Sequence, residues 1–148
     1  MQRITPFLWF NGTAAEAARF YVSVFKHRDS KLHGVSPMGA RLRLLGQELI
    51  AHNGGPEFPF TPAVSMFVAC KDQREVDTLW EKLSKGGKKG RCGWLTDRFG
   101  LSWQIIPEGF GKLMGGGGDP QRAKRVFAAM MKMKKIELKK LQRAYDAD

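Results

Sequence analysis

An internal repeat places the strongest restriction on the fold of this chain. An apolar stretch at residues 4–10 (ITPFLWF) ends at Asn11-Gly12, and this pattern predicts a buried strand followed by a turn. The pattern begins again at residues 63–70 (AVSMFVAC), after a loop rich in Gly and Pro at residues 54–59. A unit of roughly 50 residues buries too little apolar surface to be stable alone. We therefore expect two copies of one unit that share a core.

A helix is expected after the first strand of each copy. Thr13 and Glu16 have the spacing of a capping box, and Asp72 and Glu75 repeat this spacing. The apolar residues that follow fall on one helical face, so both helices are expected to be amphipathic. These residues are Ala17, Phe20, Tyr21, Val24 and Phe25 in the first copy, and Val76, Leu79, Trp80 and Leu83 in the second.

Short strands are expected to complete each copy. Turn residues divide the remaining sequence into strands at about 30–35, 40–45 and 48–53, and then near 89–93, 94–98 and 101–107. Each copy therefore has the order βαβββ, and the fold class is α+β. We expect a domain at residues 1–108, made of modules 1–56 and 57–108, followed by a helical C-terminal extension at residues 109–148.

The C-terminal extension differs in composition from the rest of the chain. Gly115–Gly118 predict a flexible joint, and Asp119-Pro120 predict the start of a helix, because Asp caps a helix and Pro suits its first turn. Residues 119–148 contain nine Lys and Arg against four Asp and Glu. We expect this basic segment to pack on the body of the protein or on a partner.

The charge of the whole chain is strongly positive. Its 148 residues include 25 Lys and Arg and 14 Asp and Glu, so the net charge is +11. Such a charge attracts nucleic acid, anionic membranes and acidic ligands. The basic residues form two runs, Lys85, Lys88, Lys89 and Arg91, and then Lys132, Lys134, Lys135, Lys139 and Lys140. Neither run contains the interleaved aromatic residues of a single-strand-binding surface, so a nucleic-acid partner is disfavoured.

Membrane insertion and export are not expected. No stretch of about 18 or more apolar residues occurs, and the N-terminal apolar stretch is too short for the core of a signal peptide. The two cysteines, Cys70 and Cys92, are expected to be free thiols in a reducing cytoplasm.

Several segments resemble one known family. They are ITPFLWFNG, AAEAARFYVSVF, ELIAHNGGPEF, GRCGWLTDRFGLSWQIIP and MMKMKKIELKKLQRAY, and the most distinctive pieces are CGW at Cys92–Trp94 and D-x-F-G-x-S-W-Q at Asp97–Gln104. These segments are similar to the PhnB-like branch, labelled 3-demethylubiquinone-9 3-methyltransferase-like, of the vicinal-oxygen-chelate (glyoxalase/bleomycin-resistance/dioxygenase) superfamily. The resemblance implies paired βαβββ modules, usually in a homodimer, with a ligand cavity between curved sheets. A doubly wound methyltransferase would need a glycine-rich loop after a strand, and Gly115–Gly118 follow no predicted strand.

The resemblance also implies where a metal would lie. Superfamily enzymes typically hold one divalent metal with His, Glu or Gln ligands from the first and last strands of each module. On this chain those positions fall at Pro6, Leu8, Ile50, His52, near Ser65 and at Gln104. One imidazole and one amide do not make a metal site, so no cofactor is expected and a divalent metal is disfavoured. His27 and His33 are expected at the surface.

The predicted site is therefore a metal-free cavity that binds a small apolar or aromatic molecule. If the strand register follows the metal-ligand positions, the cavity side includes Leu8, Phe10, Ser65, Phe67, Gln104 and Ile106, whereas Trp9, Met66, Trp103 and Ile105 pack under the helices. The predicted ligand-binding residues are Leu8, Phe10, His52, Asn53, Ser65, Phe67, Cys92, Trp94 and Gln104. A structural role is favoured for Cys92 over that of a nucleophile.

Two other functions stay open at this point. One is a metal-dependent lyase, dioxygenase or transferase whose unusual ligand set includes His52 and Gln104. The other is a nucleic-acid-associated protein that uses its basic tail. The sequence predicts no catalytic residue, and both an enzyme and a binding protein stay open.

Overall fold

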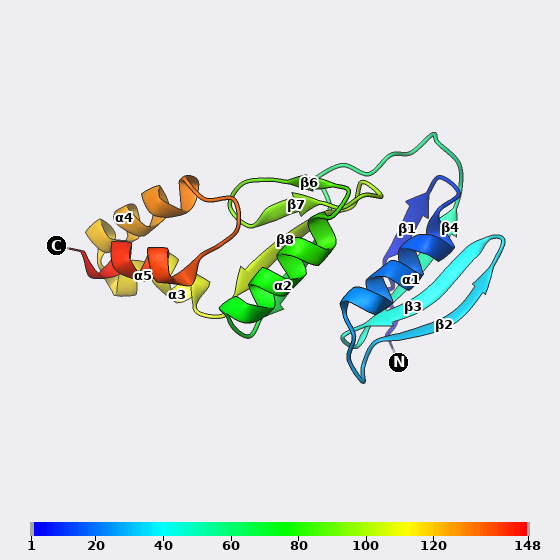
Figure 1. Cartoon of the computed structure of the whole chain (residues 1–148), viewed down its shortest axis with the longest axis horizontal. Helices are drawn as coiled ribbons and strands as arrows, with labels where there is room; N and C mark the ends of the chain where they lie inside the picture. Colours follow the sequence, from blue (N-terminus) through cyan, green and yellow to red (C-terminus); the bar gives the residue numbers. More distant parts are fainter. Residues whose placement is uncertain (1, 148) are drawn as a thin grey trace. The chain divides into compact units, whose positions relative to one another are not determined.

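A computed structural model describes residues 2–147, which form two compact units that meet in the sequence between Phe60 and Thr61 (Figure 1). Each unit contains one four-stranded sheet with one helix packed on it. The two copies predicted from the repeat correspond to these two sheets and their helices. No helix within residues 2–147 is long and apolar enough to cross a membrane.

The N-terminal unit is a βαβββ module. Its elements are β1 (Phe7–Phe10), α1 (Ala14–Val24), β2 (Lys31–Ser36), β3 (Gly39–Leu44) and β4 (Gln47–Asn53). The sheet order is β1-β4-β3-β2, and β1 is parallel to β4 while the other pairs are antiparallel. Ala17 and Tyr21 of α1 are fully buried, as are Leu42 of β3 and Leu49 of β4. The helix therefore covers one face of this sheet.

The second unit repeats this topology. Its module consists of β5 (Ser65–Cys70), α2 (Gln73–Ser84), β6 (Lys88–Lys89), β7 (Trp94–Thr96) and β8 (Ser102–Pro107). The sheet order is β5-β8-β7-β6, with β5 parallel to β8. The predicted apolar face of α2 is confirmed, because Val76, Leu79, Trp80 and Leu83 are all buried. The α+β class and the internal repeat are thus both confirmed.

The N-termini of α1 and α2 are capped by different residues. At α2, Asp72 accepts a hydrogen bond from Glu75 N at 2.8 Å, and Lys71 N donates to the Glu75 carboxylate, so the predicted cap is confirmed. At α1 the prediction was wrong, because the Thr13 side chain makes no capping hydrogen bond. The first-turn amide Ala14 N instead donates to Oδ1 of Asn53, at the end of β4, at 2.8 Å.

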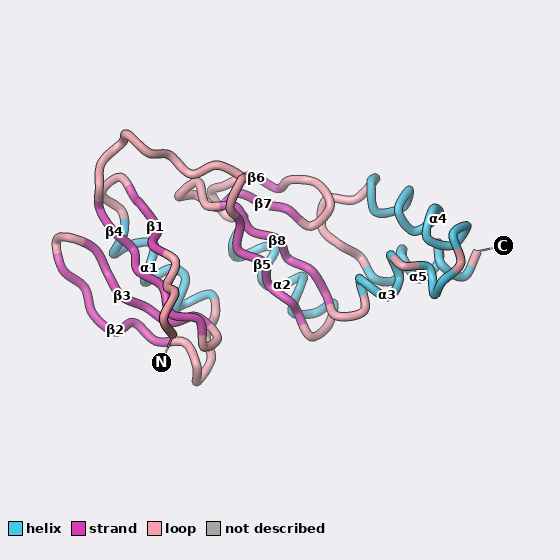
Figure 2. The backbone as a smooth tube through the Cα atoms, turned by 180° about the vertical axis from the view of Figure 1, so that it is seen from behind, coloured by secondary structure: helices cyan, strands magenta, loops and turns pink. Residues whose placement is uncertain are grey.

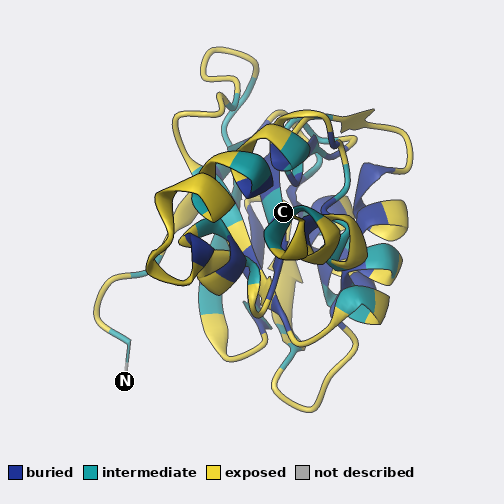
Figure 3. Cartoon of the chain, turned by 90° about the vertical axis from the view of Figure 1, so that its left-hand side faces the viewer, coloured by how far each residue is buried: buried dark blue, intermediate teal, exposed yellow. Residues whose placement is uncertain are grey.

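The C-terminal extension is helical and belongs to the second unit (Figure 2). It contains α3 (Phe110–Met114), a short 3₁₀ helix (Gly116–Gly118), α4 (Pro120–Met131) and α5 (Leu138–Asp146). Asp119 accepts a hydrogen bond from Gln121 N at 2.9 Å and Pro120 begins α4, as predicted. Helices of the chain are buried on one side and exposed on the other (Figure 3). The buried apolar residues of the extension form a cluster with the second module: Ile106, Leu113, Val126, Met130, Met133, Ile136 and Leu141.

The glycine run at Gly115–Gly118 is a packed turn, and its prediction as a flexible joint was wrong. Gly116 is buried, and a Cβ there would lie 2.4 Å from Ala123 N. A Cβ on Gly117, where φ is +62°, would meet the Tyr145 hydroxyl. Glycine is needed here because the chain approaches α4 and α5 too closely for a side chain.

Hydrogen bonds fasten the extension to α2. The Gln73 side chain donates to Ile136 O and accepts from Leu138 N, both at 2.8 Å. Lys135 Nζ lies 2.9 Å from the Asp77 carboxylate. The hydrogen bond from Gln73, followed by the Lys135 ammonium, holds the pKa of Asp77 below its ordinary value. The extension is thus tied to the second module by polar contacts as well as by its apolar cluster.

Candidate ligand-binding site

The side chains of strand β1 alternate between the helix-covered face and the uncovered face of the N-terminal sheet. Leu8 and Phe10 are buried, in register with Ala51 and Asn53 of β4, whereas Phe7 is 56% exposed. The expectation that Leu8 and Phe10 face a ligand, with Trp9 under the helix, was therefore wrong. Leu8 and Phe10 belong to the core, and Phe7 and Trp9 occupy the opposite face.

His52 is the centre of an aromatic group on this uncovered face. The rings of Phe7 and Trp9 each have their centroid 5.1 Å from that of His52. The Trp9 indole also donates to Gly55 O at 3.0 Å, and Phe58 packs edge-on against it. The loop after β4 thus holds Trp9 in place beside the predicted site residue His52.

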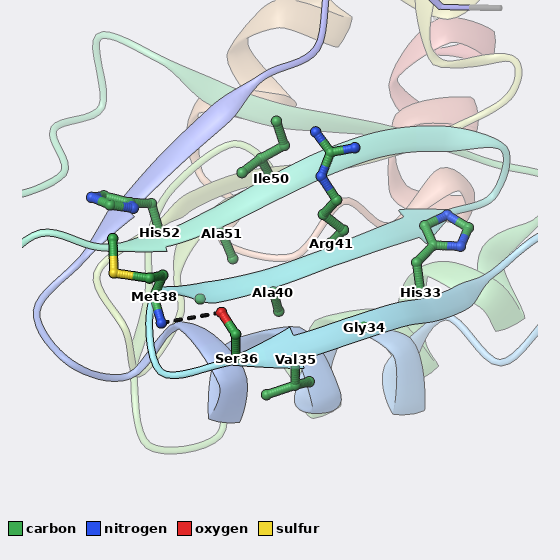
Figure 4. A pocket seen from close by; sticks show the side chains of 11 residues that line it. His33, Gly34, Val35, Ser36, Met38, Ala40, Arg41, Ile50, Ala51 and His52 are labelled. Atoms are coloured by element: carbon green, nitrogen blue, oxygen red, sulfur yellow. Dashed lines mark hydrogen bonds between the residues drawn. The ribbon is translucent and has the colours of Figure 1, made fainter.

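A hollow of about 440 Å³ lies next to this aromatic group, over β2, β3 and β4 (Figure 4). The side chains of Arg41 and Ile50 project from one face of the sheet, and those of Ala40 and Ala51 from the other (Figure 4). The lining residues are His33, Gly34, Val35, Ser36, Met38, Gly39, Ala40, Arg41, Ile50, Ala51 and His52. Most of this lining is apolar or lacks a large side chain.

Arg41 is the unneutralised charge of the hollow. Its neighbours on the strands are Gly34 of β2 and Ile50 of β4, neither of which can neutralise a guanidinium. The next cation along β3, Arg43, lies 3.5 Å from Glu48, and His33 lies 2.8 Å from the same carboxylate. Among residues 2–147, no acidic side chain forms an ion pair with Arg41. The site therefore presents a positive charge within an apolar surround.

Two glycines give the hollow its shape. A Cβ on Gly39, where φ is +147°, would lie 1.9 Å from Ala51 O, so this strand position requires glycine. Gly34 differs, because a Cβ there would meet no atom within 4 Å and its φ is not in the left-handed region. The absence of a side chain at Gly34 thus leaves open space directly beside Arg41.

A second, more polar hollow of about 550 Å³ adjoins the first and shares Arg41, His33 and Ile50 with it. Here Gln2 exchanges hydrogen bonds with the backbone of Glu48, at 3.2 Å in both directions. Arg41 therefore lies at the boundary between an apolar hollow and a polar one.

Asn53 was a predicted ligand-binding residue, but its polar atoms are already used within the module. Its Oδ1 accepts from Ala14 N, and its Nδ2 donates to Pro37 O at 3.2 Å. The side chain thereby joins the end of β4 to α1 and to the turn between β2 and β3. Its observed role is structural.

Four predicted site residues share one face of the second sheet. Gln104 lies in register with Phe67 on one side and Trp94 on the other, and its Nε2 donates to Ser65 Oγ at 3.0 Å. Phe67 is 60% exposed, so this face of β5 is not covered by α2. Ile106, which was also expected to face the cavity, is instead buried in the cluster with the C-terminal extension, so that part of the prediction was wrong.

Cys92 lies against the extension. Its thiol contacts Met130 O at 3.7 Å, and Ile136 packs beside the neighbouring Gly93. Cys70 is fully buried in β5, and burial raises the pKa of its thiol to about 12. Both cysteines are free thiols, as predicted. This packing favours the structural role expected for Cys92.

The predicted site residues did not include Arg41, Met38 or Gly34. The alternation in GARLRL could have indicated Arg41, because Leu42 and Leu44 must face the core and the arginines between them must face away. No local pattern in the sequence indicates Gly34, because its role depends on Arg41, which is its partner on the neighbouring strand β3.

Comparison with known proteins decides the family. A family model described as 3-demethylubiquinone-9 3-methyltransferase matches residues 2–106. The chain belongs to this family. The PhnB protein of Bacillus cereus, of known structure, is 34% identical with a TM-score of 0.65, over 72% of this chain and 99% of that one. A Pseudomonas aeruginosa protein of known structure is 25% identical with a TM-score of 0.61, over 73% of this chain and 98% of that one. No curated protein matches the chain.

The most distinctive motif of this 3-demethylubiquinone-9 3-methyltransferase family member has a structural role. Asp97 is 2% exposed and accepts hydrogen bonds from Phe99 N, Leu101 N and the Trp103 indole at 2.8, 3.1 and 2.9 Å. Gly100, at φ +91°, completes the turn. D-x-F-G-x-S-W-Q therefore encodes the connection between β7 and β8. Ser102 and Gln104 lie on the face shared with Ser65 and Phe67, but Ser102 is buried there.

The residues of this family member do not fit the metal that the resemblance implies. The N-terminal sheet offers His52, whose ring packs against Phe7 and Trp9, and the pair of His33 and Glu48, whose side chains bond to each other at 2.8 Å. The second sheet offers the Gln104 amide, whose Nε2 donates to Ser65. No group of three or more His, Cys, Asp or Glu side chains within residues 2–147 is arranged to hold a metal ion. Within the described residues, neither sheet therefore gathers the three protein ligands that a catalytic divalent metal needs.

Proposed function

We propose that this chain binds a small, largely apolar or aromatic molecule bearing an anionic group, in the hollow beside Arg41. The observation that carries the proposal is an arginine that has no acidic partner among residues 2–147, in a mostly apolar hollow of about 440 Å³. Pockets for small molecules commonly have volumes of about 300–1,000 Å³ and a few polar groups that orient the ligand. A ligand of this class matches both the lining and the charge.

Each part of such a ligand has a partner in the hollow. Its apolar body contacts Ile50 and Met38, and an aromatic ring extends toward the rings around His52. Its carboxylate, sulfonate or phosphate group accepts paired hydrogen bonds from the Arg41 guanidinium, whose planar donors match such oxygens. The open space at Gly34 admits that group. Binding in this way needs no metal, because the arginine supplies the charge.

Methyl transfer, which the family's description names, is not part of this proposal. The one glycine run of the chain follows the helix α3 and is packed against α4 and α5. A nucleotide-type cofactor loop requires glycines between a strand and a helix instead. The expected homodimer and cytoplasmic location stay predictions.

Binding of two fluorescent probes tests the proposal. 8-Anilinonaphthalene-1-sulfonate is aromatic and anionic, and N-phenyl-1-naphthylamine is a similar molecule without the charge. We expect the anionic probe to bind once per chain, and Arg41→Gln to weaken this binding by about tenfold while leaving the neutral probe little changed. Gly34→Leu should weaken both probes, because its side chain fills the hollow.

Matched controls separate the site from general effects. Arg19→Gln removes a charge from α1, and Gly111→Leu adds a side chain in the extension, where a Cβ would meet no atom within 4 Å. Both controls should bind the probes like the unaltered protein, with or without chelator. Equal probe binding by Arg41→Gln, Gly34→Leu and the controls would overturn the proposal, provided that all variants keep their melting temperature.

A further inference from the structure

The fold brings together two basic runs that are about 40 residues apart in the sequence. Cys92 N donates to Met133 O at 3.0 Å, and Gly93 N donates to Lys134 O at 2.8 Å. These bonds join the turn between β6 and β7 to the connection that follows α4 (Figure 1). Arg91 precedes the first of these residues, so it lies next to the basic segment that begins at Lys132.

Within the described residues, the cations at this junction form no ion pair with an acidic group. Three lysines of the two runs are neutralised: Lys89 lies 2.9 Å from Glu81, Lys135 2.9 Å from Asp77 and Lys140 2.8 Å from Glu137. Arg91, Lys132 and Lys134 are exposed, and the described part of the chain places no acidic group in an ion pair with any of them. The junction is therefore a local concentration of positive charge.

An exposed apolar stripe on α4 borders these cations. Val126 and Met130 point into the core, which leaves Phe127 and Met131 on the outer side of the helix, 52% and 45% exposed. Met131 Sδ lies 3.9 Å from Cys92 Sγ, so the stripe reaches the turn that carries Arg91. We call Arg91, Lys132, Lys134, Phe127 and Met131 together the basic–aromatic surface.

This surface depends on residues outside the family match. The family model ends at residue 106, and the Bacillus cereus structure is covered over 99% of its length by 72% of this chain. Of the basic–aromatic surface, only Arg91 lies within the matched residues. The surface is thus distinct from the hollow beside Arg41, which lies entirely in the matched part.

We propose that the basic–aromatic surface binds single-stranded nucleic acid. Unpaired Lys and Arg side chains neutralise phosphates, and an exposed aromatic ring provides a platform on which a base stacks. Only two large apolar side chains are exposed here beside three unpaired cations, a balance that favours a polyanion over insertion into a lipid surface. Phe127, Lys132 and Lys134 already lie within eight residues of the sequence, and the tertiary contacts of the extension add Arg91 to them.

Fluorescence anisotropy with the full chain and a labelled oligodeoxythymidylate of about 20 nucleotides tests this proposal at about 150 mM KCl. We expect the Arg91→Gln, Lys132→Gln, Lys134→Gln triple variant to bind at least about tenfold more weakly, with a slope of log affinity against log salt that is smaller by about 2. Phe127→Ala should weaken binding by about five- to a hundredfold, because a stacking platform is lost.

The controls remove equal charge and equal apolar surface elsewhere. The Arg19→Gln, Lys26→Gln, Lys31→Gln triple variant and Ile4→Ala alter exposed residues of the N-terminal unit. Equal losses in the two triple variants would overturn the proposal, because binding would then follow net charge alone. Equal affinity for a duplex of the same length, or tight binding to phosphatidylserine vesicles without binding to the oligonucleotide, would also overturn it.

Discussion

At the residue scale, the side chain of Asn53 connects three parts of the N-terminal module. It accepts from Ala14 N at 2.8 Å and donates to Pro37 O at 3.2 Å. We predict that Asn53→Ala lowers the free energy of unfolding by about 1–2 kcal/mol, because α1 loses its capping acceptor. Thr13→Ala is the control and should cost under about 0.5 kcal/mol, since Thr13 makes no capping bond. Urea denaturation measures both, and a larger loss for Thr13→Ala would contradict the assignment.

At the scale of secondary-structure elements, the turn between β7 and β8 depends on one buried carboxylate. Asp97 accepts from two backbone amides and from the Trp103 indole. We predict that Asp97→Asn lowers the free energy of unfolding by about 1–3 kcal/mol, because one of its terminal atoms becomes a donor and leaves a buried donor unpaired. Asp72→Asn is the same chemical change at a helix cap, where Asn is an equally good residue, and should be nearly neutral. Equal losses of stability in the two variants would contradict the prediction that the buried Asp97 carboxylate stabilises this turn.

At the scale of the whole molecule, hydrogen bonds from α2 attach the helical extension to the second module. Gln73 of α2 bonds to Ile136 O and Leu138 N, so one side chain holds the segment that leads into α5. We predict that Gln73→Ala speeds hydrogen–deuterium exchange of the Leu138 amide by about tenfold or more, because this amide loses its acceptor. Gln142→Ala, which removes only a contact on the surface of α5, should leave that exchange unchanged. Unaltered exchange in Gln73→Ala would contradict this mode of attachment.

Local patterns in the sequence predicted most of the elements. The helices follow from their apolar periodicity, and α2 and α4 begin where Asp72 and Asp119 can cap them. The repeat predicted the strand–helix–three-strand order of both modules, and the order of the strands within each sheet came from the structure. These features depend on residues within a few positions of one another. Local capping hydrogen bonds and helical or strand periodicity can therefore be predicted from the sequence.

The candidate site was harder to predict because strand β1 is apolar on both faces. FLWF shows no alternation of polar and apolar residues, so nothing in the sequence distinguishes the face of Leu8 from the face of Phe7. Packing of α1 against the sheet decided it. On β3 the alternation of Arg and Leu was present, and it places Arg41 on the uncovered face.

The sequence by itself determined the family, the two βαβββ modules and the positions of most helices and strands. Only the tertiary structure decided that Asn53 caps α1, that the glycine run is packed against Tyr145, and that Arg91 lies next to Lys132 and Lys134. The physical reason is that each of these contacts joins segments that lie far apart in the chain. Such contacts form only when whole elements dock, and the sequence around each residue does not indicate its distant partner.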